Sequence, residues 1–195
     1  GRFPDVQVTY SVFLPAKSAA ELSTKIAAVK AWLYTDLDRY HQLTDTYNPN
    51  FYRKAVFAGK LDIEDELNRI GLFTVSFSSL PFQYSEDGGM QTEYATGDTV
   101  NNPYPFPSKP YIKVYGSGEG TLTLQSASHN STWKFLELDG YLEIDSEQMN
   151  FYKEAMPKND LVEGSGFPVL YPGENAITFT GGITKIEIEP RWQTL

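Results

Sequence analysis

Apolar and polar residues alternate in the first segment of the chain, which predicts a β-strand. The apolar positions recur at every second residue, and a proline closes the segment: Val6, Val8, Tyr10, Val12, Leu14 and Pro15. A period of two places successive side chains on opposite faces of an extended backbone. We therefore expect one face of this strand to pack against an interior.

One amphipathic helix is predicted to follow. Its apolar stripe repeats at intervals of four, three and four residues, at Leu22, Ile26, Val29 and Leu33. Ser18 is the expected N-cap, and Glu21 stands three residues later, as in a capping box. We expect the helix to end near residues 34–36 and to lay its stripe against a sheet.

Two further strands are predicted around a turn, and aromatic residues follow both of them. The strands cover residues 40–46 and 51–61, and the turn is Asn48-Pro49-Asn50. The aromatic positions are Tyr40, Tyr47, Phe51, Tyr52 and Phe57. Residues 62–69 are polar and acidic, which predicts a loop or a short helical turn. Residues 71–78 alternate again and predict another strand.

The second half of the chain shows short alternating runs and no helical period. The polar, glycine-rich stretch Ser85-Glu86-Asp87-Gly88-Gly89 marks the expected boundary between domains of residues 1–86 and 87–195. Asp139-Gly140 and Gly181-Gly182 are predicted to form two-residue hairpin loops. This spacing favours a β-sandwich or jelly roll. The expected fold class is mostly β with one helix: an α+β N-terminal domain followed by a β-sandwich.

Composition and charge exclude several kinds of site. The 195 residues include no cysteine, and His41 and His129 are the two histidines. Disulfides, cysteine nucleophiles, thiolate metal sites and multi-histidine metal sites are therefore excluded. The net charge is −9, of which residues 1–88 carry −2 and residues 89–195 carry −7. An acidic second half disfavours nucleic-acid binding. No apolar run approaches the roughly 20 residues of a membrane span.

No motif positions a catalytic group or a cofactor. Gly116-Ser117-Gly118-Glu119-Gly120 lacks the Lys-Ser/Thr of a phosphate loop and predicts a β-turn between strands. A glycosidase needs two facing carboxylates, and the candidates are Glu137, Glu143, Asp145 and Glu147. Glu143 and Asp145 share the face opposite the apolar residues of their run, which predicts a solvent-facing edge. We predict no catalytic, cofactor-binding or metal-ligating residue.

Three aromatic residues of the second half can stack on sugar rings if they lie exposed on a sandwich face: Tyr115, Trp133 and Tyr141. Trp133 and Tyr141 are the candidate glycan contacts. The competing interpretation, which we favour, is that these rings pack in the core. Three function classes therefore stay open at this point: a structural protein, a carbohydrate-binding module and a hydrolase.

Several segments, taken in order, resemble one protein family. They are the helix ending in Ala31-Trp32-Leu33, the hairpin of residues 45–58, the strand of residues 71–77 with Pro81-Phe82, residues 108–118, and the ending Pro190-Arg191-Trp192. This order is similar to that of the distal tail proteins of long-tailed, non-contractile phages (siphophages) and their prophages. The resemblance covers nearly the whole chain and rests on order and spacing.

The resemblance implies a structural virion protein without enzymatic activity or cofactor. Family members form a homo-hexameric ring through the N-terminal domain. The ring joins the major tail tube protein to the tail-associated tip or lysin protein and to receptor-binding or baseplate proteins for host attachment. The C-terminal domain is galectin-like. The implied location is the tail tip of the virion, after synthesis in the cytoplasm of the bacterial host. Neither a membrane nor sequence-specific nucleic acid is an implied partner.

The resemblance also gives two expectations for the N-terminal domain. Family chains usually begin with further strands before the segment matching residues 6–14, so the domain is expected to lack its first strands here. The aromatic hairpin suits a ring interface, because aromatic side chains supply buried anchor area between subunits. The candidate interface residues are Tyr40, Tyr47, Phe51 and Tyr52.

Overall fold

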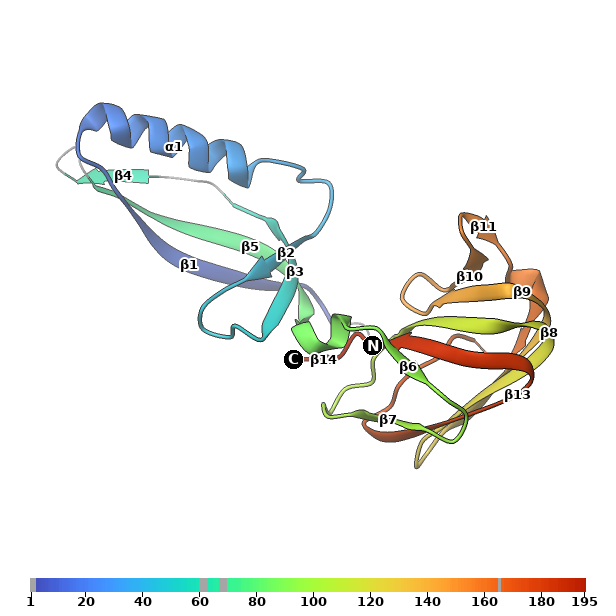
Figure 1. Ribbon diagram of the computed structural model, residues 1–195. Helices are drawn as coiled ribbons and strands as arrows, with labels where there is room; N and C mark the ends of the chain where they lie inside the picture. The colour runs from blue at the N-terminus through green and yellow to red at the C-terminus, as the bar shows by residue number, and fades with distance from the viewer. Residues whose placement is uncertain (1–2, 60–62, 67–69, 165) are drawn as a thin grey trace. The chain divides into compact units, whose positions relative to one another are not determined.

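The computed structural model describes residues 3–59, 63–66, 70–164 and 166–195. The chain divides into two compact units, one of Gly1–Gln83 with Leu195 and one of Tyr84–Thr194. Strands dominate both units, and α1 (Ala19–Leu33) is the one α-helix in these described ranges (Figure 1). The predicted fold class, mostly β with a single helix, is confirmed.

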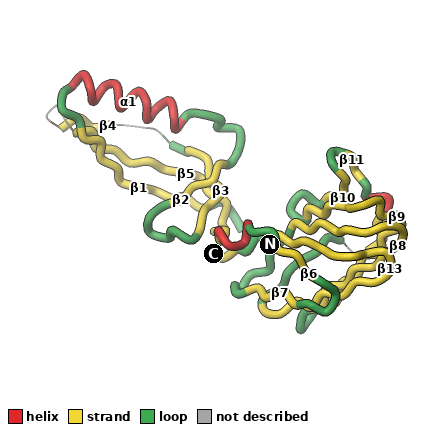
Figure 2. The backbone as a smooth tube through the Cα atoms, in the orientation of Figure 1, coloured by secondary structure: helices red, strands yellow, loops and turns green. Residues whose placement is uncertain are grey.

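The first unit is an antiparallel sheet with the helix on one face (Figure 2). Its strands are β1 (Val6–Pro15), β2 (His41–Thr44), β3 (Phe51–Phe57), β4 (Ile63–Glu66) and β5 (Ile70–Ser85). The order in the sheet is β1-β5-β3-β2, and β4 also pairs with β5. In β1 and β5, Val12 lies opposite Phe73 and Tyr10 opposite Val75, so apolar side chains of neighbouring strands share the face under the helix.

The helix begins and packs as its sequence predicts. Ser18 is the N-cap, and its hydroxyl accepts a hydrogen bond from the Glu21 N–H at 3.2 Å. The Glu21 carboxylate accepts in turn from the Lys17 N–H, one residue before the position of an ideal capping box. Leu22 and Leu33 are buried, and Leu33 joins the core of the sheet.

Several boundaries of the first unit differ from the sequence prediction. The strand predicted for residues 40–46 is the shorter β2, His41–Thr44. Residues 63–66 form the strand β4 and not a loop or helical turn, because their backbone pairs with β5 from Ile70 to Phe73. The strand predicted for residues 51–61 ends at Phe57, and residues 60–61 lie outside the described residues. The strand predicted for residues 71–78 runs on as β5 to Ser85.

The second unit is a single ladder of strands folded around one core. Its elements are η1 (Glu86–Gly89), β6 (Thr92–Tyr94), β7 (Thr99–Asn102), β8 (Tyr111–Gln125), β9 (Asn130–Asp145), β10 (Asn150–Lys153), β11 (Met156–Pro157), η2 (Asn159–Leu161), β12 (Val162–Gly164) and β13 (Gly173–Glu189). The last strand, β14 (Gln193–Thr194), pairs with β5 and not with this ladder. The main order is β11-β10-β9-β8-β13-β6, with β12 paired to β9 and β7 to β13. Both halves of β8, β9 and β13 send side chains into the same core.

The two hairpin loops predicted from glycine pairs are wrong. Asp139-Gly140 lies inside β9 and Gly181-Gly182 lies inside β13. The glycine run at residues 116–120 likewise lies inside β8 and is not a turn between two strands. The three strands meet here: Gly116 is opposite Gly140, and Gly120 is opposite Gly181. The register shifts between Gly118 and Gly120 in the β8–β9 pairing and after Gly181 in the β13–β8 pairing. A side chain does not fit at Gly116, Gly181 or Gly182, whereas Gly140 has open space but a positive φ of 82°.

Candidate functional site

The sheet of the first unit ends in two strands whose outer edges face away from its other strands. Within the described ranges, β1 pairs with β5 alone and β2 pairs with β3 alone. Such edges present backbone N–H and C=O groups to solvent or to another chain. β1 is ten residues long, and its side chains are exposed or half-buried along its whole length. An edge strand of this length leaves many backbone groups available for pairing.

An apolar hollow lies beside the second of these edges. It has a volume of about 380 Å³, and its lining includes Trp32, Leu33, Leu43, Ala55, Phe57 and Phe77. Trp32 is the residue before the buried Leu33 in the last turn of α1, and its side chain is 66% exposed. Tyr34 packs edge-to-face on Phe57, with ring centroids 5.1 Å apart. Exposed apolar groups therefore gather where the end of α1 meets β2.

The opposite face of the same sheet is covered by small hydroxyl side chains. They lie on neighbouring strands and are exposed or half-buried: Thr9, Ser11, Thr74, Ser76 and Ser78. The hydroxyls of Thr9 and Ser76 are 3.2 Å apart across β1 and β5. The sheet thus has one face built for the helix and one face rich in small hydroxyl groups, where Phe13 and Leu72 are also exposed.

The predicted interface residues lie on one hairpin but not on one face. Tyr47 is 88% exposed at the turn between β2 and β3. The Tyr40 hydroxyl donates a hydrogen bond to the Asp5 carboxylate. Phe51 and Tyr52 are half-buried neighbours in β3 and point to opposite faces of the sheet. The sequence interpretation missed Trp32 as a surface residue, although its place next to Leu33 puts it off the apolar stripe.

The second unit presents tyrosines, lysines and glutamates on three neighbouring strands. The Tyr111 hydroxyl donates to Glu143 at 2.6 Å, and burial together with this carboxylate raises the pKa of Tyr111. The Tyr115 hydroxyl donates to Glu187 at 2.8 Å. Register places Lys113 between Glu187 and Glu143. Tyrosine hydroxyls therefore hold both carboxylates in place on this face.

The candidate glycan contacts do not form a stacking platform. Trp133 is only 1% exposed, and its indole N–H donates to the Gly166 carbonyl at 2.9 Å. Its burial in the core removes Trp133 from the candidate sugar contacts. Tyr141 is half-buried, and the Lys113 ammonium lies 3.9 Å from its ring centroid. This cation occupies a face of the ring that a sugar would need.

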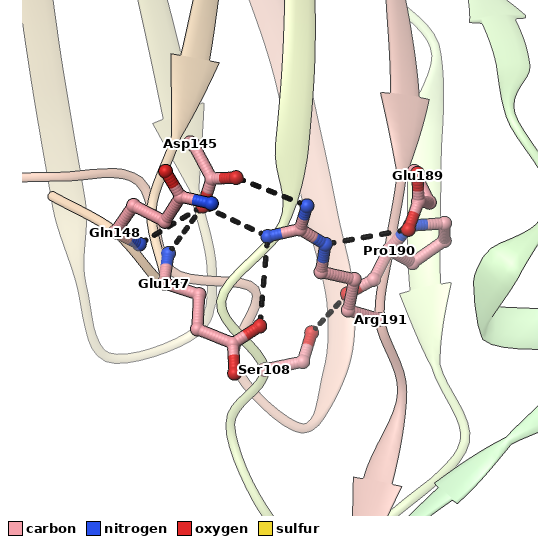
Figure 3. A network of polar contacts seen from close by, with 7 residues as sticks. All are labelled: Ser108, Asp145, Glu147, Gln148, Glu189, Pro190 and Arg191. Atoms are coloured by element: carbon pink, nitrogen blue, oxygen red, sulfur yellow. Dashed lines mark hydrogen bonds and ion pairs between the residues drawn. The ribbon is translucent and has the colours of Figure 1, made fainter. Parts of the chain in front are cut away.

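The most developed polar network of the second unit centres on Arg191 (Figure 3). The guanidinium donates to both carboxylate oxygens of Asp145, at 2.9 and 3.1 Å, and to Glu189 at 3.3 Å. Asp145 also accepts the backbone N–H groups of Glu147 and Gln148. Burial alone would raise the pKa of Asp145, but these donors outweigh burial and hold the pKa below its ordinary value.

This network corrects the interpretation of Asp145 as a solvent-facing residue. Its side chain is 5% exposed, because the C-terminal segment covers the end of β9. The same segment forms two backbone hydrogen bonds with residues 85–88, at the start of the unit. The Arg191 N–H donates to the Gly88 carbonyl at 2.7 Å, and the Ser85 N–H donates to the Trp192 carbonyl at 3.0 Å. The Ser108 hydroxyl donates to the Pro190 carbonyl at 2.7 Å. The Pro-Arg-Trp motif therefore ties together segments distant in sequence.

The structure assembles no metal-binding group in its described ranges. There, no three or more His, Cys, Asp or Glu side chains are arranged to hold a metal ion. The same residues include no helix long and apolar enough to cross a membrane. The geometry that stands out is the open sheet of the first unit and the braced core of the second.

Known proteins resemble this chain in structure, but no known protein was matched by sequence alone. No protein-family model and no curated protein matches the chain in sequence. The crystal structure of the Dit protein (gp 19.1) of phage SPP1, presented as a paradigm of the hub adsorption apparatus in phages that infect Gram-positive bacteria, aligns with a TM-score of 0.76. The alignment covers 98% of this chain and 80% of that chain at 14% identity.

A second solved structure aligns more weakly. It is the baseplate of phage P2 in its activated conformation with Ca, with a TM-score of 0.49 and 8% identity over 94% of this chain and 78% of that chain. The resemblance derived from the order of sequence motifs is confirmed at the level of the fold by the SPP1 alignment, which spans both units. The chain therefore has the fold of a phage distal tail protein.

Proposed function

We propose that this protein is a structural component of a long, non-contractile phage tail. It is the hub at the tail tip, where it joins the tail tube to the host-adhesion apparatus. The observation that carries the proposal is the alignment of 98% of the chain with the SPP1 Dit hub protein. The sequence motifs that suggested this family run through both units, which supports the same role.

The first unit is the ring-forming part in this proposal. An open sheet with terminal strands β1 and β2 suits head-to-tail contacts between copies, which close into a cyclic assembly. Six copies form the ring. The hydroxyl-rich face of the sheet faces the central opening in this proposal, where small polar groups offer few anchors to the DNA phosphates. Tyr47, with 88% of its side chain exposed, is the best placed of the predicted hairpin contacts.

The second unit faces outward as a galectin-like domain in this proposal. The partners of the hub are its own copies, the major tail tube protein, the tail-associated tip protein and receptor-binding or baseplate proteins. The role is structural and not enzymatic. In the second unit, the carboxylates of Glu143 and Glu187 already accept hydrogen bonds from tyrosine hydroxyls.

Immunogold electron microscopy of the phage that encodes the chain tests the proposed location. Antibodies against the second unit are expected to label the distal end of the tail, because that unit faces outward. Gold on the capsid, along the tube, or on no virion structure contradicts the proposal. Labelling of the same particles with an antibody against the tail tube protein serves as the positional control.

The alternative function, a carbohydrate-binding module, is weakened by the burial of Trp133 and by the lysine over Tyr141. On a glycan array, we expect the wild type and Tyr141→Ala to give the same result, with no glycan bound through Tyr141. Binding that depends on Tyr141 would instead assign a sugar-recognition role to this face.

A further inference from the structure

We propose that the outer face of the second unit's sheet binds an acidic side chain of another protein, and that the Lys113 ammonium group receives it. This tyrosine–lysine face is formed by β8, β9, β10 and β13, and its centre is the pair of rings of Tyr115 and Tyr141. The inference names a docking surface and the chemistry of its partner. It rests on the proposed function in one respect, because the partner is sought in assembled phage tails.

Alternation along β8 separates this face from the core. Ile112 and Val114 are fully buried and belong to the core of the second unit. Tyr111, Lys113 and Tyr115 alternate with them, are half-buried, and point to the opposite side of the strand. Among the described residues, the second unit contains no α-helix. No helix of their own unit therefore covers these side chains, and part of each is open to another molecule.

Three ammonium groups gather around two tyrosine rings on this face. Tyr115 and Tyr141 lie opposite each other in β8 and β9, with ring centroids 6.2 Å apart. The Lys113 ammonium lies 3.9 Å from the Tyr141 centroid, and the Lys153 ammonium lies 5.2 Å from it. The Lys185 ammonium lies 4.7 Å from the Tyr115 centroid. The rings attract these cations, so positive charge is concentrated at the centre of the face.

Lys113 differs from the other two lysines in having no ion pair. Lys185 pairs with Glu93 at 2.6 Å, and Lys153 pairs with Asp139 at 3.2 Å. In the part of the chain that the structure describes, no carboxylate oxygen lies within 4.0 Å of the Lys113 ammonium. Lys113 is therefore a half-buried cation that its own chain contacts through aromatic rings and not through a counter-charge.

The strand register explains why Lys113 lacks a counter-charge. It lies between Glu187 of β13 and Glu143 of β9. Both carboxylates accept hydrogen bonds from tyrosine hydroxyls, at 2.8 and 2.6 Å, and from further donors. These donors hold the two carboxylates, and the ammonium lies over the Tyr141 ring instead. A half-buried charge without a counter-charge costs free energy, which an incoming carboxylate recovers.

Tyr141 adds a second donor beside Lys113. Among the described residues, its hydroxyl has no hydrogen-bond partner, so it can donate to an incoming oxygen. A hollow of about 100 Å³ adjoins this ring, and its lining includes Lys153 and Lys158. The ammonium, the hydroxyl and the hollow together suit one carboxylate group of a side chain.

The acidic groups around the lysines favour a folded protein over a polyanion as the partner. Glu93 is exposed beside Lys185, and Glu137 and Asp139 line the hollow. A polymer of phosphate groups would meet these carboxylates with like charge. A folded partner can present one acidic side chain to Lys113 and basic or neutral side chains to its surroundings. Tyrosines are also enriched in protein–protein interfaces.

Zero-length cross-linking in purified tails tests this docking directly. A carbodiimide joins an amine to a carboxylate in contact with it, with loss of water and without adding a spacer. In tails of the phage that encodes the chain, we expect Lys113 to be joined to an Asp or Glu of a different tail protein, which mass spectrometry identifies. Lys185 and Glu93, 2.6 Å apart within the chain, should be joined as well, which shows that the reaction has worked.

Variants of Lys113 test the charge by affinity for the protein found in this way. Lys113→Gln is expected to weaken binding of that protein to the purified chain about tenfold or more, because a desolvated charge pair is lost. Lys113→Arg keeps the cation and should retain most of the affinity. Lys134→Gln is the matched control at an exposed lysine of β9 that pairs only with Glu119, and it should leave binding unchanged. Unchanged binding by Lys113→Gln would overturn the role given to Lys113.

Three further outcomes separate this inference from its alternatives. Tails that contain the chain and show the Lys185–Glu93 link, but no link from Lys113 to another protein, would overturn the inference and leave the hub proposal standing. Absence of the chain from purified tails would contradict the proposed function and, with it, the partner named here. Isothermal titration calorimetry with inorganic polyphosphate is expected to show no binding. Polyphosphate binding that Lys113→Gln abolishes would assign the face to a polyanion and overturn the choice of a protein partner.

Discussion

Gly182 lies at the point where β13 approaches β8 most closely. A Cβ atom added at this glycine would lie 1.8 Å from the Ser117 carbonyl oxygen, well inside any real contact. Gly116 is equally constrained, with a hypothetical Cβ 2.2 Å from the Gly182 oxygen. Neither contact is with a flexible side chain, so the backbone itself would have to move. The two glycines therefore allow the strands to approach each other within the bent ladder.

Gly182→Ala is expected to destabilise the second unit by about 3 kcal/mol or more, because backbone must shift in a packed region. Gly89→Ala is the control: nothing lies within 4 Å of its hypothetical Cβ, and its stability should stay within about 0.5 kcal/mol of the wild type. Urea unfolding followed by tryptophan fluorescence measures both. A Gly182→Ala protein as stable as the control would show that the strands tolerate separation.

The ion pair of Asp145 and Arg191 is expected to stabilise the second unit. Asp145→Asn should cost about 2 kcal/mol at pH 7, because charged hydrogen bonds to Arg191 are lost. Since the pKa of Asp145 is lowered in the folded protein, its stabilisation is present above the ordinary value of 3.8. It is lost as the pH falls through the lower folded value.

The stability difference between wild type and Asp145→Asn should therefore shrink progressively below about pH 4. Urea unfolding at several pH values follows this difference. Glu174→Gln, at an exposed carboxylate of β13, is expected to match the wild type at neutral pH. Equal stability of wild type and Asp145→Asn at pH 7 would mean that the Arg191 network adds nothing to the fold.

At the scale of elements, α1 depends on a narrow contact with its sheet. Leu33 is 4% exposed and packs in the core with Phe73, Val75 and Phe77, whereas most other positions of the helix face solvent. Leu33→Asp is expected to destabilise the first unit by more than about 3 kcal/mol, because it buries an unpaired charge in an apolar contact.

Ala28→Asp is the matched control for this substitution, because Ala28 lies on the exposed side of the same helix. Chemical unfolding of the two variants under identical conditions separates burial from helix propensity. A loss below about 1 kcal/mol for Leu33→Asp would show that the helix face is not buried as described.

The elements that sequence predicted well are those whose local pattern and environment agree. The helix is marked by its stripe and by the Ser18 cap, and β1 by alternation. The two predicted hairpin loops were wrong, because a glycine required by close strand approach, such as Gly182, or by a positive φ within a strand, such as Gly140, looks in sequence like a glycine of a hairpin turn. Which aromatic residues are exposed also depends on tertiary packing: Trp133 is buried, while Trp32 is not.

At the scale of the whole molecule, the two units differ in how completely they bury their apolar side chains. The second unit has a large closed core and a C-terminal segment that braces it through Arg191. The first unit has a small core, long open strand edges and many exposed apolar side chains. A closed core like that of the second unit is typical of a domain that folds by itself. Open strand edges and exposed apolar side chains like those of the first unit are typical of a surface that is covered in an assembly.

Negative-stain electron microscopy of the purified protein tests this account most directly. The hub proposal predicts six-fold rings with a central opening, formed through the first unit. The rings should become more abundant as the protein concentration rises through the micromolar range, because assembly follows mass action. Uniform single chains at every concentration would contradict the account and would make a binding module the better description of the protein.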